Sequence, residues 1–430
     1  MAREMKSSGI AWIGDIPTEW ELGRTKNCFF THKEIAGNTA DDYERLALTL
    51  NGVIKRSKND STGLQPEAFN SYQILRKNEL VFKLIDLANI ATSRVGYSPY
   101  TGLVSPAYIV LHPYEEDESK FGVYYFLSLW QREVFNHMGD DGVRSSLNVG
   151  DLLNIPYPIV SIKEKKRIVS YLDTECSRID SVIEQTRASI EEYKKLKQAV
   201  ITEAVTKGIR PDRQMKDSGI EWIGEIPDEW EMIRIKHISS LVTDGAHISP
   251  ETENGVYDFI STVNIDDGKI HFDSCLKTSA SSYEYLAATG CQPQRGDVLI
   301  SKDGTVGKTA IVTEDRDFVV SSSLVIIRPI SEMINSEFLN YALNSKTVQD
   351  TLVLLMHGAG LKRVSVAKNA NLTVARPPKL EQIEIVSYLN KKCKEIDSLI
   401  RAKEKSIYEI EKYKRSIIFE YITGKKEVPV

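Results

Sequence analysis

The stretch of sequence that decides the fold is IVSYLDTECSRIDSVIEQTRASIEEYKKLKQAVITEAVTKG, residues 168–208, which returns as IVSYLNKKCKEIDSLIRAKEKSIYEIEKYKRSIIFEYITGK at residues 385–425. The two segments align without a gap, and about 18 of roughly 41 positions are identical. Neither contains proline, and glycine occurs only near the ends. Each segment therefore predicts a helix of about 40 residues, or about 60 Å at 1.5 Å per residue.

Apolar residues recur in both segments at steps of three and four, which leaves a narrow apolar seam on each helix, flanked by mixed charges. A polar residue interrupts each seam at the same position, Thr186 in one copy and Lys403 in the other. A seam this narrow must be buried against a partner, and we expect the two copies to pair antiparallel, so that the rod sets the distance between two domains. The alternative is two independent surface helices, each packed on its own domain. The residues that we expect to pair the helices are Leu172, Ile179, Ile183, Ile190, Leu389, Ile396, Ile400 and Ile407.

A second repeat lies near the start of each half of the chain. Residues 8–21, SGIAWIGDIPTEWE, return as SGIEWIGEIPDEWE at 218–231. The chain is therefore a module of roughly 210 residues written twice. Between these shared ends only short echoes align, such as residues 78–82 with 296–300. We interpret the ends as performing one mechanical function twice and the middles as binding two different targets; neutral drift after an old duplication is the alternative.

The middles contain short apolar or alternating runs bounded by turn residues, which predict strands, and segments at 121–137 and 336–355 with helical spacing. We therefore predict an α+β protein with two globular mixed α/β recognition domains joined by two long antiparallel helices. The predicted boundaries are 1–161 for the first domain, 162–210 for the central helix, 211–378 for the second domain and 379–430 for the C-terminal helix.

The composition limits the classes of protein to which the chain could belong. Lys and Arg number 55 and Asp and Glu number 60, so the formal net charge is 55 − 60 = −5, which is less basic than an autonomous nucleic-acid-binding domain. Any such surface must be local or completed by a partner. The N-terminus lacks the apolar core of a secretory signal and no run is long enough to span a bilayer, so we expect a cytoplasmic chain. The five scattered cysteines lack a Cys-x-x-Cys pair, and the seven histidines lack an i, i+4 pair, so we expect neither disulfides nor a metal site.

Catalytic motifs are absent or incomplete. Gly304-Thr-Val-Gly-Lys-Thr resembles a phosphate-binding loop, but Lys302 stands where its first glycine is needed. Asn154-Ile-Pro-Tyr has isoleucine where the tetrad of amino-group DNA methyltransferases has proline, and Pro211-Asp212 has no matching acidic-x-Lys strand. We therefore expect a chain that binds and does not catalyse.

The binding candidates are basic residues in loops that also carry Ser, Thr, His or Gly, because such side chains contact phosphates and base edges. Each short cluster is also typical of an ordinary solvated loop, but clusters recur at corresponding places in the two halves. The candidate DNA-contacting residues are Lys55, Arg56, Lys58, Arg94, Arg144 and Ser145 in the first half and Thr243, His247, Lys302, Lys308, Lys362, Arg363 and Ser365 in the second.

The paired Trp-Ile-Gly-x-Ile-Pro-x-x-Trp segments, the glycine turn at 296–307, the Gly-x-Gly-x-Lys-Arg loop at 358–363 and the twin Ile-Val-Ser-Tyr-Leu helices together resemble the specificity subunits of type I restriction-modification systems over essentially the full chain. The resemblance implies that each domain recognises one half of a split site in double-stranded DNA. It also implies that the helices dock two modification subunits, with restriction subunits in the larger complex. Methyl transfer from S-adenosylmethionine, and the ATP and magnesium chemistry of translocation and cleavage, would belong to those partners, with no cofactor in this chain.

The rival hypothesis is a non-catalytic scaffold in which the duplicated domains bind two proteins without recognising DNA. A complete restriction enzyme in one chain is disfavoured by the missing nuclease and methyltransferase motifs.

Overall fold

The computed structural model describes residues 3–60, 68–85, 87, 93–138, 146–252, 255–356 and 362–429. By their contacts these residues form two compact units, Met1–Thr186 with Lys405–Val430 (unit 1) and Arg187–Glu404 (unit 2). The division falls inside the long helices, near the matched interruption of their seams, whereas the three boundaries predicted from the sequence separate the helices from the domains. Each helix therefore contributes one part to each unit.

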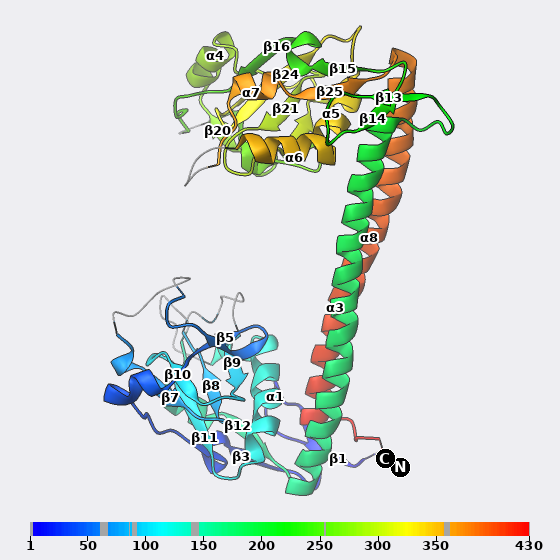
Figure 1. The fold of residues 1–430 in the computed structure, drawn as a ribbon. Helices are drawn as coiled ribbons and strands as arrows, with labels where there is room; N and C mark the ends of the chain where they lie inside the picture. The colour runs from blue at the N-terminus through cyan, green and yellow to red at the C-terminus, as the bar shows by residue number, and fades with distance from the viewer. Residues whose placement is uncertain are drawn as a thin grey trace. The chain divides into compact units, whose positions relative to one another are not determined.

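Unit 1 contains two four-stranded sheets, in the orders β6-β5-β10-β7 and β4-β11-β8-β9, and two small two-stranded sheets, β1-β2 and β3-β12 (Figure 1). Its strands are β1 Met5–Ser7, β2 Asp15–Pro17, β3 Glu21–Arg24, β4 Phe29–Phe30, β5 Arg45–Thr49, β6 Gly52–Arg56, β7 Gln73–Leu75, β8 Leu80–Phe82, β9 Val95–Tyr97, β10 Gly102–Val104, β11 Ile109–Pro113 and β12 Pro156–Ile159, and its own helices are α1 Glu118–Gln131 and α2 Val149–Asn154.

Unit 2 contains sheets in the orders β16-β24-β21-β22 and β20-β17-β23, and three two-stranded sheets, β13-β14, β15-β25 and β18-β19. Its strands are β13 Met215–Asp217, β14 Glu225–Pro227, β15 Glu231–Arg234, β16 Ser239–Asp244, β17 Tyr257–Ile260, β18 Ile265–Asp266, β19 Lys269–Ile270, β20 Leu276–Thr278, β21 Val298–Ser301, β22 Thr309–Ile311, β23 Phe318–Val320, β24 Leu324–Pro329 and β25 Thr373–Arg376. Its own helices are α4 Ala280–Ala288, α5 Ser336–Asn344, α6 Lys346–Leu355 and α7 Val366–Ala370.

The two units share most of their strand order, including the middles whose sequences do not align, although the sheet β6-β5-β10-β7 has one strand more than β20-β17-β23 and only unit 2 contains β18-β19. The antiparallel order β4-β11-β8-β9 of unit 1 matches β16-β24-β21-β22 of unit 2, element by element along the chain. The parallel pair β5 and β10 likewise matches β17 and β23. Even the register of the opening hairpin is repeated, since Met5 faces Pro17 and Met215 faces Pro227. The duplication therefore extends into the middles of the module.

The long helices are α3 Ile162–Lys207, of 46 residues, and α8 Lys379–Ile422, of 44 residues. Inside unit 1 the ring of Tyr171 lies 4.5 Å from that of Tyr421, and Lys414 bonds Asp180 at 2.6 Å. In unit 2 a lysine of α3, Lys197, bonds Asp397 of α8 at 2.8 Å. In each unit the helices pair side by side. Within unit 1, partner numbers fall along α8 as they rise along α3, so the pair is antiparallel.

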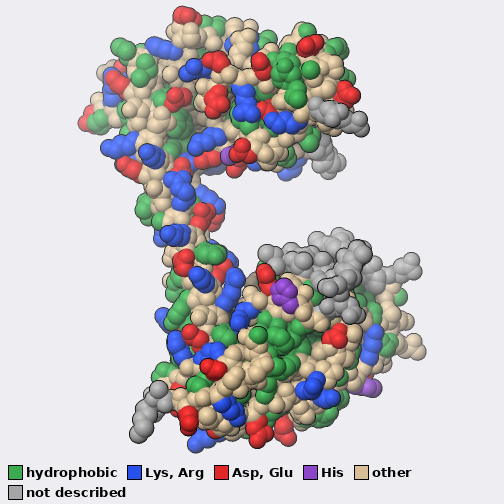
Figure 2. All heavy atoms as spheres, turned by 180° about the vertical axis from the view of Figure 1, so that it is seen from behind, with side chains coloured by type: hydrophobic (Ala, Val, Ile, Leu, Met, Phe, Trp, Pro, Cys, Tyr) green, Lys and Arg blue, Asp and Glu red, His purple; other side chains and the backbone are tan. Residues whose placement is uncertain are grey.

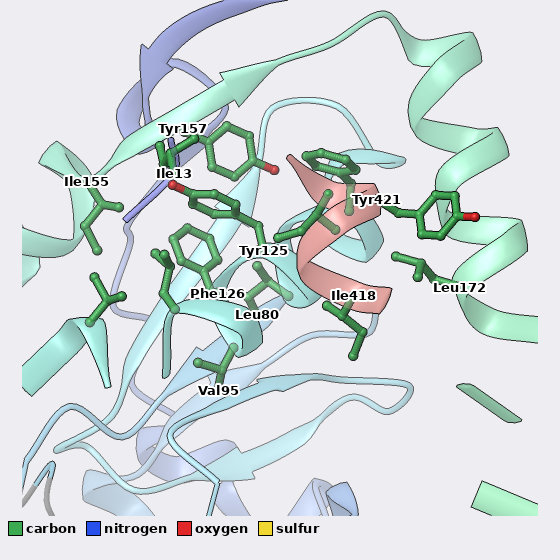
Figure 3. Packing of buried hydrophobic residues seen from close by; sticks show 14 of the residues in the cluster. Ile13, Leu80, Val95, Tyr125, Phe126, Ile155, Tyr157, Leu172, Ile418 and Tyr421 are labelled. Carbon is green, nitrogen blue, oxygen red and sulfur yellow. The ribbon is translucent and has the colours of Figure 1, made fainter. Parts of the chain in front are cut away.

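Six of the eight residues predicted to pair the helices are buried. Leu172, Ile179, Ile183, Ile190, Leu389 and Ile396 are buried, and Ile400 and Ile407 are half-buried. Figure 3 shows Ile418 and Tyr421 of α8 beside Leu172 of α3, next to the aromatic core of unit 1 around Tyr125. The α+β prediction with two long antiparallel helices is confirmed, and each helix also supplies part of a domain core.

One contact fixes the start of each long helix in both units. Glu164, in the first turn of α3, accepts a hydrogen bond from Trp20 Nε1 at 3.0 Å and pairs with Arg3 at 2.6 Å. Glu381, in the first turn of α8, accepts one from Trp230 Nε1 at 3.0 Å and pairs with Arg213. A carboxylate is favoured at a helix N-terminus, because the unpaired amides there carry partial positive charge. The repeated tryptophans of the opening segments therefore anchor the repeated helices.

Two helical segments predicted as continuous are divided. The segment 336–355 forms α5 and α6, because Ser345 has extended backbone and its hydroxyl caps α6 by accepting a bond from Val348 N at 3.5 Å. The segment 121–137 forms α1 followed by a short 3-10 helix at Val134–His137, because Glu133 adopts a left-handed conformation that ends the first helix.

Candidate nucleic-acid interface

Three of the loops predicted to bind DNA meet in unit 2. They are the segment after β16, the turn between β21 and β22, and the segment that precedes α7. Gly304 N donates to Lys362 O at 3.2 Å and Val364 N donates to Lys302 O at 2.9 Å, so the second and third loops pair through their backbones. Segments about 60 residues apart in the sequence thus form one structured surface.

Five charged or titratable side chains connect these loops into what we term the ionic network. Asp244, at the end of β16, contacts His247 at 3.0 Å and Lys302 at 3.2 Å. Lys302 also contacts Asp303 at 3.4 Å, and Asp303 accepts a hydrogen bond from Arg363 Nε at 2.6 Å. The network is buried at its centre and exposed at its two ends. The side chain of Lys302 is 7% exposed, whereas those of Arg363 and His247 are 60% and 70% exposed.

This burial corrects the prediction for Lys302, which we expected to face DNA. Its ammonium group lies between the carboxylates of Asp244 and Asp303, and a buried charge requires such partners. Lys302 therefore holds the two acidic residues in place beneath the surface, while Arg363 and His247 occupy the exposed ends of the network.

Glycines serve two of these loops in different ways. Gly304 has a φ of +71°, a conformation that L side chains rarely adopt, in the turn between β21 and β22. A Cβ on Gly245, next to Asp244, would lie 2.1 Å from the carbonyl oxygen of Val320. Gly304 therefore allows the turn itself, and Gly245 allows the end of β16 to lie against the backbone of Val320.

The other candidates in unit 2 have different surroundings. Lys362 is exposed, and Lys308 pairs with Asp266 at 3.1 Å while remaining 34% exposed. Thr243 is half-buried within β16. Ser365 is exposed, and its hydroxyl caps α7 by accepting a bond from Lys368 N at 3.3 Å, which gives it a structural role.

In unit 1, three candidates lie on or just after β6, and each has an acidic neighbour. Lys55 pairs with Glu44 at 2.5 Å, Arg56 with Asp60 at 2.8 Å, and Lys58 with Asp41 at 3.5 Å. Lys55 also lies over the ring of Tyr100, 5.3 Å from its centre.

The remaining candidates of unit 1 are not retained or are not placed. Arg94 is 0% exposed, so the prediction of a surface contact there is corrected to a buried arginine. Arg144 and Ser145 lie outside the described residues.

Sequence reasoning selected the cations of unit 2 and missed the acidic residues that organise them. Asp244 and Asp303 each precede a glycine, in Thr243-Asp-Gly and Lys302-Asp-Gly. The shared Asp-Gly pair was the available signal, because aspartate before glycine at a strand end is typical of a turn.

Charge is mixed over both units. Figure 2 shows Lys and Arg side chains interspersed with Asp and Glu over the visible face of each unit, which agrees with the net charge of −5. Among the described residues no cluster of His, Cys, Asp and Glu could hold a metal ion, and no helix is long and apolar enough to cross a membrane. All five cysteines are free thiols.

Residues 227–411 match the family model described as the type I restriction modification DNA specificity domain. The putative type I restriction enzyme MjaX specificity subunit of Methanocaldococcus jannaschii is 24% identical over 97% of this chain and 96% of its own length. The type I restriction enzyme MjaVIII specificity subunit of the same organism is 29% identical over 64% of this chain and 63% of its own.

A solved structure described as the structural basis of complex assembly and conformational transition of the type I R-M system contains a chain with the same fold. Its TM-score is 0.67, with 14% identity over 96% of this chain and 99% of that chain. The fold that the two chains share is a duplicated α+β domain on two long helices. In sequence, residues 227–411 match the type I restriction modification DNA specificity domain, and nearly the whole chain is similar to a putative specificity subunit of a type I restriction enzyme.

Proposed function

We propose that each unit recognises one half of a bipartite DNA site, unit 1 through the loops around β6 and unit 2 through the loops of the ionic network. The observation that supports this proposal most directly is the shared topology of the two units combined with different loops. One framework used twice, with loops that differ in length and charge, suits two unrelated short sequences.

The long helices would set the separation of the two half-sites and dock two modification subunits. The packing of the helices supports this role. Each helix contributes residues to the hydrophobic cores of both units, so a change in the length of a helix would affect both units. A spacing near one helical turn of DNA, about 34 Å, places two half-sites on the same side of the duplex.

The chain itself would break and form no covalent bond. Methyl transfer from S-adenosylmethionine would take place on the modification subunits, and ATP- and magnesium-dependent translocation and cleavage on restriction subunits in the larger complex. The names of the relatives support this assignment, since each is a specificity subunit. They do not favour the alternative of a scaffold that binds only proteins.

A domain exchange tests the proposal. Residues 22–155 are replaced by the corresponding region of a relative, and the chain is assembled with its modification subunits. Methylated adenines are then mapped across a genome. We expect one half of the methylated motif to change and the other half and the spacer to remain. A change in both halves, or in neither, would contradict independent recognition by the two units.

A further inference from the structure

Arg363 is exposed, yet its orientation is fixed. Its Nε donates to Asp303 Oδ1 at 2.6 Å, and the side chain of Asp303 is only 12% exposed. The two residues also face each other as a backbone bridge, flanked by the hydrogen bonds from Gly304 to Lys362 and from Val364 to Lys302. The segments that carry Asp303 and Arg363 are therefore held together by backbone hydrogen bonds, which fix the two side chains relative to each other.

A guanidinium bound in this way can still form two hydrogen bonds. Because Nε is taken by Asp303, the two terminal nitrogens remain as donors, and within the described residues Asp303 is the only acidic partner of Arg363. The major-groove edge of guanine presents two acceptors, N7 and O6, and a bidentate arginine is the most common specific contact to it. An arginine that is already oriented also loses less rotamer freedom on binding.

The charge balance favours a base over a phosphate for this residue. Two carboxylates, of Asp244 and Asp303, stand against two cations, Lys302 and Arg363, so the network has no net charge when His247 is neutral. A compensated cation attracts the phosphate backbone weakly, since that attraction depends on net charge and counterion release. The interaction that Arg363 can still make strongly is therefore a directional hydrogen bond to a base.

The adjacent residue, Lys362, differs from Arg363 in its charge balance. Lys362 is exposed, and no ion pair to its side chain occurs in the part of the chain that the structure describes. An uncompensated lysine on the same loop is suited to a phosphate, and it provides a neighbouring control for Arg363.

We propose that Arg363 recognises one guanine of the half-site of unit 2, and that Asp303 is the positioning residue that makes this recognition specific. The proposal rests on DNA recognition by unit 2, as proposed above. Asp303 does not contact DNA in this scheme. It acts by holding the guanidinium at Nε and is itself held by Lys302.

The experiment uses the chain assembled with its modification subunits. The methylated motif of the wild type is mapped first. Binding is then measured on duplexes in which each position of the unit 2 half-site is changed in turn and the other half-site is kept. We expect R363A to lose its preference for guanine at one position by roughly 5- to 150-fold and to keep its preferences elsewhere. D303N should relax the same position, by less.

Two matched variants separate positioning from general damage. D244N also removes a carboxylate from Lys302 but leaves the Arg363 contact in place, so guanine preference should persist. K362A should weaken binding evenly at all sequences and lower the slope of log affinity against log salt by about one.

The outcomes discriminate the two proposals. If R363A weakened all sequences evenly or kept the full wild-type preference, recognition of guanine by Arg363 would be overturned. If D244N relaxed the guanine position as much as D303N, the positioning role of Asp303 would be overturned. If the wild-type complex showed no split motif at all, the proposed function would fail, whatever the variants do.

Discussion

The repeated Glu–Trp–Arg contact allows one substitution to be made twice in the same molecule at different burial. Glu381 has a side chain 4% exposed and accepts bonds from Arg213 and from Trp230 Nε1, whereas Glu164 makes the same contacts to Arg3 and Trp20 with a side chain 25% exposed. Glutamine has nearly the same shape as glutamate, so E381Q and E164Q remove the charge and little else.

The two losses should differ in size. Breaking a buried ion pair costs about 3–5 kcal/mol, because an uncompensated charge is left in the interior. Arg213 keeps Glu229 at 3.1 Å, which places E381Q near the lower limit, about 3 kcal/mol. At Glu164 water reaches the pair, so the loss of charged hydrogen bonds, about 1.5 kcal/mol, is the better estimate. The difference corresponds to roughly a tenfold difference in an opening equilibrium.

Native-state hydrogen exchange read by mass spectrometry measures this locally. Peptides from residues 5–21 cover the hairpin of β1 and β2, and peptides from residues 215–231 cover that of β13 and β14. We expect E381Q to speed exchange in the second hairpin by roughly a hundredfold, and E164Q to speed it in the first by roughly tenfold. Equal effects, or a larger effect of E164Q, would refute the argument that burial decides the strength of this contact.

Three further predictions follow from the packing and the titratable groups. Burial lowers the pKa of His112, but its bonds to Glu79 and to the carbonyl of His32 raise it more, so the pKa lies above its ordinary 6.5. The stabilisation is then complete below about pH 6.5 and declines as the pH rises through the folded-state value, and H112Q should flatten that decline in the difference between melting curves at about pH 6 and 8. L172A, at a fully buried seam position, should cost about 2–5 kcal/mol in chemical denaturation, whereas I400A, at a half-buried position, should cost less. Deleting residues 186–192 from α3 alone shifts its seam by about one heptad, and the permitted spacer of the methylated motif should change or assembly should fail; an unchanged spacer would show that the helices do not set it.

Periodicity and repetition made the long helices and the sheet strands predictable. The apolar positions around Leu172 and Leu389 recur at helical spacing and no proline interrupts either segment, so no other local structure competes with the helix. Strands β8 and β21 are short, fully buried apolar runs, and the sequence pattern identifies such runs without revealing which neighbour each one pairs with. The strand order that the two middles share could therefore not be predicted from the sequence. Buried apolar residues can replace one another without changing the strand, so the two middles no longer align.

The candidate surface was predictable in its location and not in its electrostatics. Glycine-flanked basic loops identified the segments that meet in unit 2. Whether a given lysine is a surface cation or a buried partner depends on carboxylates that come from another loop, as Asp244 does for Lys302. Arg94 shows the same limit in unit 1, since nothing local distinguishes a buried arginine from an exposed one.

The framework of each unit tolerates chemical change at positions that keep their geometry. Glu79, just before β8, bonds His112 of β11 at 2.6 Å, and Asp297, just before β21, bonds Arg328 of β24 at 2.8 Å. The acidic and the basic residue stand at equivalent places in matching strands, yet both have changed in identity. A contact that depends only on opposite charge at fixed strand positions can persist through such exchanges. The loops at the strand ends carry no such requirement, because the sheet order is maintained by the strands themselves. Divergence can therefore accumulate in the loops and change what each unit binds, while the strands and the long helices keep their places.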